Sequence, residues 1–246
     1  MIQLENICKQ YTNHNHTVRA VDNVSFSVAP NERVGIAGGS GSGKSTLLRM
    51  IALLEKPTSG NLWLFGKDVT SIQNHTDLYR SMQMMFQNPL AVIPPRMNLE
   101  AFLLEPYINY GLMDVAAAKD DIRKWMQRVD LPENTVNKYP HEVSGGQLQR
   151  VVLARIMLMN PKLVLFDEPT SALDAVNQKL VLDLLQKLHR EQPFGYVFVS
   201  HDIGLLQAVT DRIIVMKDGQ IVETIESKRL KEAVHPYTQA LVEASV

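Results

Sequence analysis

The sequence has a single cysteine, Cys8, among its 246 residues. One thiol can form neither an internal disulfide nor a metal site built from several cysteines, and it fits a reducing compartment such as the cytoplasm. A cationic start followed by an apolar core is also missing, so nothing in the sequence indicates a secretory signal. Charges cut the longest apolar stretches, as Arg155 does between Val151 and Met159, which predicts that no segment crosses a bilayer. A link to a membrane must therefore come through a partner.

An excess of charge of one sign is absent as well. Lys and Arg together number 25 against 26 Asp and Glu, which leaves a formal net charge of −1. Domains that bind nucleic acid usually carry a basic surface, so this balance predicts no nucleic-acid partner. The length is sufficient for a sizeable core, in one large domain or two small ones.

The pattern along the chain predicts an α/β protein. Alternating apolar and polar residues at 2–7 and 24–28 indicate strands on either side of a polar loop at 12–17. Strands and helices alternate from residue 33 and again from 144 to 215, which is typical of a mainly parallel sheet. We expect further strands at 33–37, 61–66, 82–86, 163–166, 196–200, 212–216 and 221–224, with a turn at 217–220. The expected helices include 44–54, 99–110 and 115–129.

The middle of the sequence, from about residue 89 to 140, differs from the rest because it is rich in proline and reads as helical. Its prolines include Pro89, Pro94, Pro95, Pro106 and Pro132. We interpret this stretch as a helical insertion between strands of the sheet.

A glycine-rich segment, here called the phosphate loop, follows the apolar strand that ends at Ala37. It fits the pattern G-x-x-x-x-G-K-[ST] and consists of Gly38, Gly39, Ser40, Gly41, Ser42, Gly43, Lys44 and Ser45. Glycines let backbone N–H groups turn toward phosphate oxygens, and the following helix adds its positive end. Lys44 can reach the β- and γ-phosphates, and the Ser45 hydroxyl can ligate Mg²⁺. With Thr46 next in the helix, these residues predict an ATP site; a chance glycine-rich turn is the alternative.

Two adjacent acids, Asp167 and Glu168, follow an unbroken apolar strand. Because side chains alternate along a strand, the two carboxylates should point in different directions and take different roles. Asp167 suits the Mg²⁺ shell, through a water molecule, and Glu168 suits polarising the water that attacks the γ-phosphate. A solvated acidic turn is the alternative.

Gln87 and His201 stand just after two further predicted strands. Ligands of open α/β sheets bind outside the carboxyl ends of the strands, so polar groups at four such ends should meet at one phosphate site. The Gln87 amide oxygen could ligate Mg²⁺ or the attacking water, and His201 could contact the γ-phosphate or orient Glu168. Taken alone, Gln87 also fits a plain loop residue and His201 a structural histidine.

A second anion site is predicted where Ser144, Gly145, Gly146 and Gln147 open a periodic helix. Ser144 is a good N-cap, but two glycines in a first turn weaken a helix start. They make sense if an anion approaches the backbone at the positive end of the helix. A head-to-tail pair of chains would then give each nucleotide one site from each chain, in an isologous interface. A plain capped helix is the alternative.

The combined motif set resembles an ATP-binding-cassette (ABC) ATPase, and the resemblance covers essentially the whole chain. The motifs stand in the family's order: the phosphate loop, Gln87, Val143–Gln147, Leu163–Glu168, Ser171–Asp174 and His201. The resemblance implies a P-loop NTPase core with a mainly parallel sheet, an N-terminal antiparallel β subdomain and a helical insertion subdomain. Within one cassette over 1–246, we expect the core with its β subdomain at about 1–88 and 160–225, the helical subdomain with the signature motif at about 89–159, and a helical tail at 226–246.

The resemblance also implies roles for individual residues, with ATP and Mg²⁺ as cofactors. Glu168 would be the catalytic base, assisted by His201 and Gln87. The helix start at 144–147 would reach the nucleotide of a partner cassette, and the 171–174 loop would lie across the dimer seam. Tyr11 stands where the family often has an aromatic residue that stacks on adenine; local packing of a strand-end tyrosine is the alternative.

A narrower likeness is to the peptide and nickel uptake branch of ABC importers. It rests on the segments Lys138–Glu142, His235–Leu241, Gln87–Pro89 and Pro95–Met97. Many members have a longer tail, sometimes with a cysteine cluster, whereas this sequence ends at Val246 with only Cys8. We therefore expect no iron–sulfur cluster, and the short form is more similar to the nickel or metal–metallophore members. The cargo stays open among peptide, nickel and metallophore complexes.

The resemblance places the chain at the cytoplasmic face of the cell membrane, as a peripheral subunit. The implied partners are a second ABC ATPase subunit (a paralogue or an identical chain), two transmembrane permease subunits and, indirectly, an extracytoplasmic solute-binding protein. Residues Phe102, Leu103, Tyr107 and Tyr110 of the insertion would either line a groove for a permease helix or form the insertion's own core. The rival functions are an ABC efflux or lipid-extraction ATPase and a non-transport ABC regulatory switch.

Overall fold

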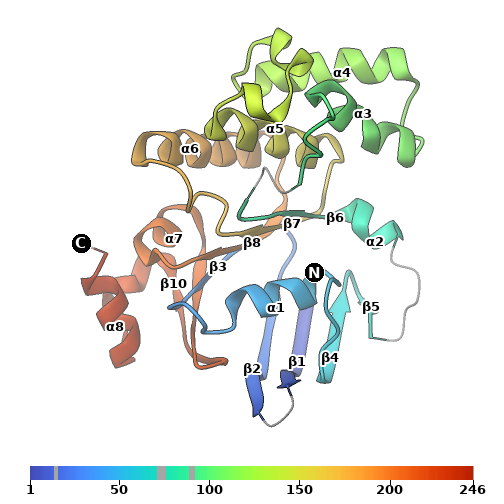
Figure 1. The fold of residues 1–246 in the computed structure, drawn as a ribbon. Coiled ribbons are helices and arrows are strands. Elements are labelled where there is room, and N and C mark those ends of the chain that lie inside the picture. Colours follow the sequence, from blue (N-terminus) through green and yellow to red (C-terminus); the bar gives the residue numbers. More distant parts are fainter. Residues whose placement is uncertain (14–15, 71–75, 89–91, 246) are drawn as a thin grey trace. The chain divides into compact units, whose positions relative to one another are not determined.

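The computed structural model describes residues 1–13, 16–70, 76–88 and 92–245. The chain divides into two compact units, each described by itself here (Figure 1). Unit 1 comprises Met1–Met84, Lys162–Glu168 and Pro193–Val246, and unit 2 comprises Met85–Pro161 and Pro169–Gln192. The subdomain boundaries expected from the sequence stay a prediction, and Pro89, at the start of the expected insertion, lies outside the described residues.

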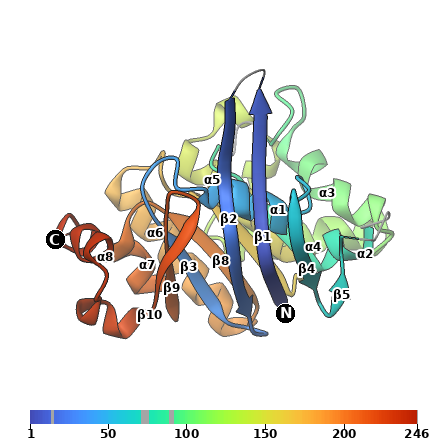
Figure 2. The ribbon, with the colours of Figure 1, turned by 90° about the horizontal axis from the view of Figure 1, so that it is seen from below.

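Unit 1 contains an antiparallel sheet with strand order β2-β1-β4-β5, in which the long strands β1 and β2 lie side by side (Figure 2). Its strands are β1 (Ile2–Asn13), β2 (His16–Val28), β4 (Ser59–Leu64) and β5 (Lys67–Asp68). The prediction of a polar loop at 12–17 was wrong for its four described residues. Thr12 pairs with Thr17, and Asn13 pairs with His16, so all four belong to the β1–β2 hairpin. Strand pairing satisfies the backbone groups of these polar residues, which a hydrophobic pattern does not reveal.

A second sheet has the strand order β10-β9-β3-β8-β7-β6. Strands β3, β8, β7 and β9 run parallel where their pairing is described, and β10 returns antiparallel to β9. This agrees with the expected α/β class, including the turn at Asp218 and Gly219, where both residues have positive φ. The strands are β3 (Arg33–Ala37), β6 (Met82–Met85), β7 (Leu163–Asp167), β8 (Gly195–Ser200), β9 (Arg212–Lys217) and β10 (Gln220–Glu226).

The helices of unit 1 follow its strands. They are α1 (Lys44–Ile51), α2 (Thr76–Ser81), α7 (Ile203–Val209) and α8 (Pro236–Glu243), with a 3₁₀ turn at Ser227–Glu232. Helix α1 ends three residues before the expected Leu54. The reason is local: Leu53 takes a left-handed φ of 61°, and the Leu54 N–H turns back to donate to the Arg49 carbonyl.

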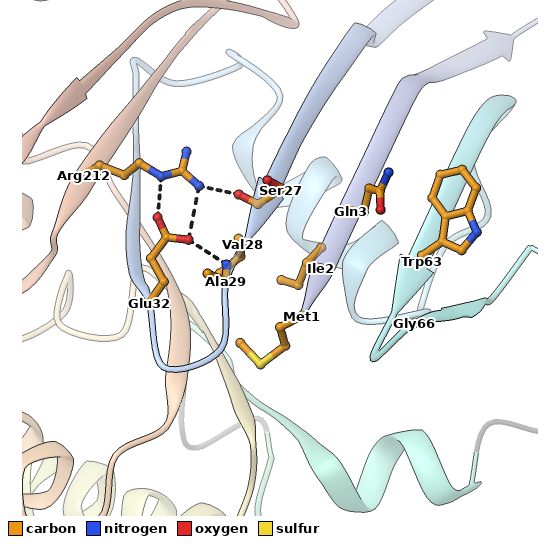
Figure 3. A pocket seen from close by; sticks show the side chains of 10 residues that line it. All are labelled: Met1, Ile2, Gln3, Ser27, Val28, Ala29, Glu32, Trp63, Gly66 and Arg212. Carbon is orange, nitrogen blue, oxygen red and sulfur yellow. Dashed lines mark hydrogen bonds and ion pairs between the residues drawn. The ribbon is translucent and has the colours of Figure 1, made fainter.

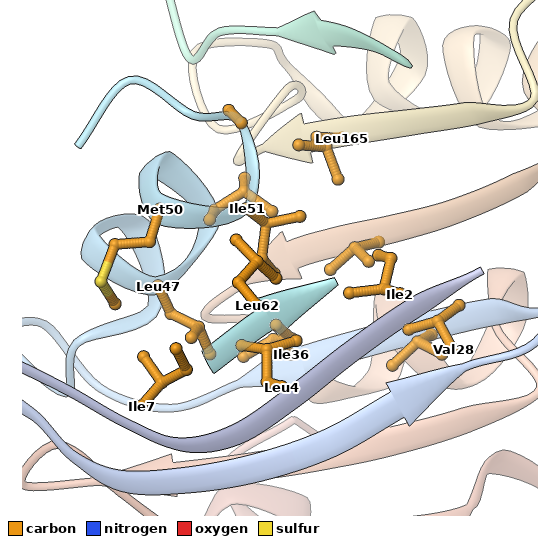
Figure 4. Close-up of a cluster of buried hydrophobic side chains, with 14 of the residues drawn as sticks. Ile2, Leu4, Ile7, Val28, Ile36, Leu47, Met50, Ile51, Leu62 and Leu165 are labelled. Carbon is orange, nitrogen blue, oxygen red and sulfur yellow. The ribbon is translucent and has the colours of Figure 1, made fainter. Parts of the chain in front are cut away.

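A hydrophobic cluster joins the antiparallel sheet of unit 1 to helix α1 and to the parallel strands (Figure 4). It includes Leu4 and Leu62 from one sheet, Leu47 from α1, and Ile36 and Leu165 from the other sheet, all 2% exposed or less. Burying each such side chain contributes roughly 1.5–3 kcal/mol. The cluster therefore fixes strand β3, which precedes the phosphate loop, and helix α1, which follows it.

Unit 2 is mainly helical. Its α-helices are α3 (Leu99–Asn109), α4 (Val115–Arg128), α5 (Gly145–Leu158) and α6 (Ala175–Glu191), with 3₁₀ turns at Glu133–Asn137 and Pro140–Glu142. Phe102, Leu103 and Tyr107 are at most 2% exposed, so they form the core of this unit and do not line a groove. Across the described ranges of both units, none of the helices combines the length and the apolar character needed to span a membrane.

Candidate functional site

The phosphate loop is tightly packed against backbone on both of its flanks. Gly38 has a φ of +153°, and a Cβ there would lie 2.3 Å from the Met216 carbonyl oxygen. Gly43 has a φ of +97°, and a Cβ there would lie 2.2 Å from the Ala20 carbonyl oxygen. Helix α1 begins directly after Gly43, which has no side chain to cap it. The first N–H groups of the helix are thus left to a ligand at the positive end of the helix dipole.

Lys44 points its ammonium group into the phosphate loop. Its Nζ donates to the carbonyl oxygens of Gly38 and Gly39, at 2.8 Å each, and the residue is only 5% exposed. Burial lowers the pKa of Lys44, and the negative charges of Glu168 and Asp167 partly offset this. An ammonium group held by two neutral carbonyl oxygens is ready to exchange them for charged phosphate oxygens, which form stronger hydrogen bonds.

Ser45 and Asp167 are brought together from distant parts of the sequence. The Ser45 hydroxyl donates to the Asp167 carboxylate at 2.9 Å. Asp167 ends strand β7 and is 6% exposed, so burial raises its pKa, while the hydrogen bond from Ser45 lowers it. A hydroxyl and a buried carboxylate are both hard oxygen donors of the kind Mg²⁺ prefers, so this pair fits the metal.

Glu168 leaves the line of strand β7 immediately after Asp167. It has a left-handed φ of 45°, and its N–H donates to the Val199 carbonyl of strand β8 at 3.1 Å. A non-glycine residue in this region is strained, which is common where a side chain must take one direction. The His201 Nδ1 lies 3.3 Å from the Glu168 carboxylate, and their side chains are 64% and 20% exposed. A carboxylate beside an imidazole and open to water can accept a proton.

Tyr11 lies on strand β1 close to the start of helix α1. Its hydroxyl donates to the Glu55 carboxylate, and Lys9 lies 5.2 Å from its ring centre. Burial and the Glu55 hydrogen bond raise the pKa of Tyr11, and a hydrogen bond with Thr46 acts the other way. Tyr11 is 42% exposed, so part of the residue is open to solvent.

Gln87 belongs to unit 2, two residues beyond strand β6. Its amide donates to the Ser171 hydroxyl at 3.3 Å, and both residues are exposed. The sequence pattern did not reveal this pairing, because Ser171 stands 84 residues away. The loop that contains Ser171 leads to Asp174, which caps helix α6 by accepting from the Asn177 N–H at 2.9 Å.

The helix start at Ser144 is also in unit 2, and it forms a reciprocal capping box. The Gln147 N–H donates to the Ser144 hydroxyl at 3.3 Å, and the Ser144 N–H donates to the Gln147 side chain at 3.0 Å. A Cβ on Gly146 would lie 2.9 Å from the Asn177 Oδ1, whereas one on Gly145 would meet only Leu173, at 4.0 Å. The Asn177 amide is the end of a flexible side chain and can move aside, so this contact by itself does not require glycine at position 146.

Unit 1 therefore gathers the phosphate loop, the Ser45–Asp167 pair and the Glu168–His201 pair at the carboxyl ends of three adjacent strands, β3, β8 and β7. Sequence reasoning missed one contact of the loop: the Gly39 N–H donates to the Tyr237 hydroxyl at 2.7 Å. Tyr237 lies in the His235–Leu241 segment, and nothing in its local pattern indicated a partner 198 residues away.

A pocket of about 560 Å³ in unit 1 is lined by none of these residues (Figure 3). Met1 and Trp63 form part of its wall. Its two charged side chains are paired, since Arg212 lies 2.6 Å from Glu32 and also donates to the Ser27 carbonyl. We assign no function to it.

Comparisons with known proteins agree with this geometry. The family described as ABC transporter matches residues 21–171. The oligopeptide transport ATP-binding protein AppF of Bacillus subtilis is 38% identical, over 92% of this chain and 70% of that protein. The oligopeptide transport ATP-binding protein OppF of Salmonella typhimurium is 38% identical, over 93% and 70%. The di/tripeptide transport ATP-binding protein DppF of Pseudomonas aeruginosa is 39% identical, over 93% and 72%.

A solved structure is similar as well. The ATP-binding cassette MJ0796, in a dimeric post-hydrolysis state bound to ADP and Pi, superposes with a TM-score of 0.84 at 31% identity. The match covers 92% of this chain and 99% of that chain. A second dimeric structure of MJ0796, described as a bacterial ABC transporter cassette, matches at the same TM-score with 32% identity.

Proposed function

Because the chain belongs to the ABC transporter family and is one of its ATPases, we propose that it is the ATP-hydrolysing subunit of a membrane importer, with peptides as the cargo class. One observation carries the ATPase part: a phosphate loop, a hydroxyl–carboxylate pair and a carboxylate–imidazole pair at the ends of three adjacent strands. The names of the relatives carry the import and cargo part, since three of them are peptide transport ATP-binding proteins and others, 37% identical, are named putative peptide import ATP-binding proteins.

We assign the binding step to unit 1. The N–H groups of the phosphate loop and of the first turn of α1 bind the phosphates, and the Lys44 ammonium turns from the Gly38 and Gly39 carbonyls to the β- and γ-phosphate oxygens. The Tyr11 ring stacks on the adenine, since it lies beside Thr46 at the start of the same helix. The Lys44 side chain is buried, which strengthens its charge interaction with the phosphates.

Ser45 and Asp167 would hold Mg²⁺, with Asp167 acting through a water molecule. When bound, the metal supplies neutralisation of the charge on the β- and γ-phosphates. The buried Asp167 carboxylate has a raised pKa without it, so a cation close by would favour its charged form.

We assign the chemical step to Glu168. Its carboxylate accepts a proton from water as the water oxygen bonds to the γ-phosphorus; the bond from that phosphorus to the bridging oxygen of ADP breaks, and phosphate leaves. His201, 3.3 Å from Glu168, orients the carboxylate and contacts the γ-phosphate. A well-placed base contributes roughly 10²–10⁴ in rate.

A second ABC ATPase subunit completes the site. The capped helix start at 144–147 is exposed at Ser144 and Gly145, so a partner's nucleotide can approach its N–H groups. The partner is a paralogue or an identical chain, and ATP would close the pair while hydrolysis reopens it. Two permease subunits and, indirectly, a solute-binding protein complete the importer, with this chain at the cytoplasmic face of the membrane.

The proposal is tested by purifying the tagged chain from detergent-solubilised membranes of its native cell and identifying its partners by mass spectrometry. Two permease-like proteins and a second ABC ATPase are expected. Recovery of soluble partners alone, with the chain absent from membranes, would contradict the transport role. Cells lacking the gene should then lose uptake of a labelled tripeptide and regain it with the wild-type gene but not with Lys44→Met. Loss of labelled nickel uptake instead would overturn the peptide assignment in favour of a nickel or metallophore cargo.

A further inference from the structure

A hydrogen bond joins the tail helix α8 of unit 1 to the phosphate loop (Figure 1 shows α8 at the C-terminal end). The Gly39 N–H donates to the Tyr237 hydroxyl oxygen at 2.7 Å. A Cβ added to Gly39 would lie 3.1 Å from the same oxygen, so the two residues are closely packed. The proposed mechanism leaves this contact without a role.

The direction of the bond follows from the geometry of one peptide unit. The Gly38 carbonyl and the Gly39 N–H belong to the same peptide, and in a trans peptide these two groups point in opposite directions. The Gly38 carbonyl accepts from the Lys44 ammonium inside the loop, at 2.8 Å. The Gly39 N–H must therefore point out of the loop, toward Tyr237. Tyr237 therefore does not compete with a phosphate for this donor. It binds the peptide on the side that faces away from the inside of the loop.

This peptide is the one in the loop that most needs an anchor. It lies between two glycines, which lack a Cβ and so permit the peptide plane to rotate. A rotated peptide would turn its carbonyl away from the Lys44 ammonium. Lys44 would then lose one of its two 2.8 Å partners and with it part of its fixed direction.

Tyr237 is itself held in place by its neighbours. The Lys217 ammonium lies 5.2 Å from its ring centre. His235 caps the helix by accepting from the Tyr237 N–H at 3.2 Å, and the Glu223 carboxylate accepts from the Val234 and His235 N–H groups at 2.9 and 3.3 Å. The hydroxyl is thus presented to the loop by a short helix tied to the end of strand β9 and to strand β10.

We propose that Tyr237 is a positioning residue that fixes the Gly38–Gly39 peptide, so that the tail helix sets the geometry of the phosphate loop before the nucleotide binds. The proposal rests on the proposed function only in taking the loop as the ATP site. Without the hydroxyl, the Gly38–Gly39 peptide would be rotated in part of the molecules. The apparent affinity for ATP would then fall in proportion to the fraction of molecules whose loop can still bind. A neutral hydrogen bond contributes about 0.5–1.5 kcal/mol, so we expect roughly 2- to 10-fold weaker ATP binding.

The peptide can be observed directly by NMR in the full chain. Glycine labelled with ¹³C at the carbonyl and ¹⁵N at the amide gives a carbonyl-correlated signal only where one glycine follows another. Such pairs occur at Gly38–Gly39 and Gly145–Gly146, so the spectrum reports Gly39 and carries Gly146 as an internal control. Gly39→Ala removes one signal and so assigns both.

Tyr237→Phe removes the hydroxyl and keeps the ring. In the nucleotide-free chain, the Gly39 amide proton is expected to move upfield and to exchange faster with solvent, while the Gly146 signal stays in place. Dissociation constants for Mg-ATP, measured by titration calorimetry, should rise by the factor given above. In the hydrolysis assay KM should rise with kcat at saturating ATP nearly unchanged, a split that general loss of structure would not produce. Tyr139→Phe, on the exposed surface of unit 2, is the matched control and should change neither quantity.

The outcomes are separable. An unmoved Gly39 signal in Tyr237→Phe would show that the contact is absent, and a moved signal with unchanged Mg-ATP affinity would show that the contact does not position the loop; either overturns the proposal. Failure of the wild-type chain to bind Mg-ATP would overturn the proposed function, while the Gly39 signal would still decide the contact.

Discussion

Replacing Glu168 by glutamine is the sharpest test of the chemical step. Glutamine matches glutamate in size, so the side chain can keep its place beside the His201 ring, 3.3 Å away. The left-handed backbone at Glu168 is unaffected by a change at the end of the side chain. The substitution therefore removes one property, the ability to accept a proton.

The expected size of the effect follows from that property. General base catalysis contributes roughly 10²–10⁴ in rate, which corresponds to about 2.7–5.4 kcal/mol in the activation barrier. ATP binding should persist, because the phosphate loop and Lys44 are unchanged. It should tighten slightly, because a negative charge that acts on Lys44 is removed from the neighbourhood of the γ-phosphate.

The assay is a single-turnover experiment, in which excess protein is mixed with labelled Mg-ATP and phosphate release is followed after quenching. This isolates the chemical step from product release. Binding is measured in parallel by calorimetry. Glu5→Gln changes an exposed glutamate of strand β1 in the same way and should hydrolyse ATP at the wild-type rate. Lys44→Met should lose binding and gives the background from contaminating ATPases.

The assignment of Glu168 as the base would be refuted if the Glu168→Gln variant hydrolysed ATP within about threefold of the wild-type rate. For this result to count, the Lys44→Met variant must show only background hydrolysis. The attacking water would then be activated by another group. A variant that lost both binding and turnover would instead place Glu168 in the binding step.

Three further outcomes are expected. Asp167→Asn should raise the urea midpoint of the nucleotide-free chain at pH 7, because burial raises the pKa of Asp167 and its charged form destabilises the fold. This gain in stability should shrink as the pH falls through the raised pKa toward 3.8, where the carboxyl group becomes protonated. A gain that persists in acid would contradict this explanation. Gly146→Ala should change the urea midpoint only slightly, because the Asn177 amide is the end of a flexible side chain that can move aside and alanine favours a helix over glycine by about 1 kcal/mol; a loss above about 2 kcal/mol would show that Asn177 holds its place. Tyr11→Leu should weaken Mg-ATP binding roughly fivefold in calorimetry while Tyr11→Phe binds normally, and equal losses in both would favour the hydroxyl over the ring.

Local patterns in the sequence predicted much of the fold. The expected helices at 99–110 and 115–129 correspond to α3 and α4 within one residue at each end, because Asn98 and Asp114 cap their first turns. The turn at 217–220 was recognisable because Gly219 readily takes a positive φ. The predicted boundaries were wrong where the hydrophobic pattern does not report the deciding interaction. Examples are the Thr12–Thr17 pair of the β1–β2 hairpin and the left-handed Leu53 that ends α1.

The sequence by itself determined the chemistry of the candidate site. A phosphate loop between strand and helix, and acids after an apolar strand, follow from composition and spacing, because the carboxyl ends of parallel strands share one edge. Whether Ser45 reaches Asp167, whether Glu168 faces His201 and which group lies behind Gly39 depend on side chains 33 to 198 residues apart. Those distances are set by the packing of strands and helices against a common core. Only the tertiary structure could therefore decide them, and it brought Tyr237 to the phosphate loop.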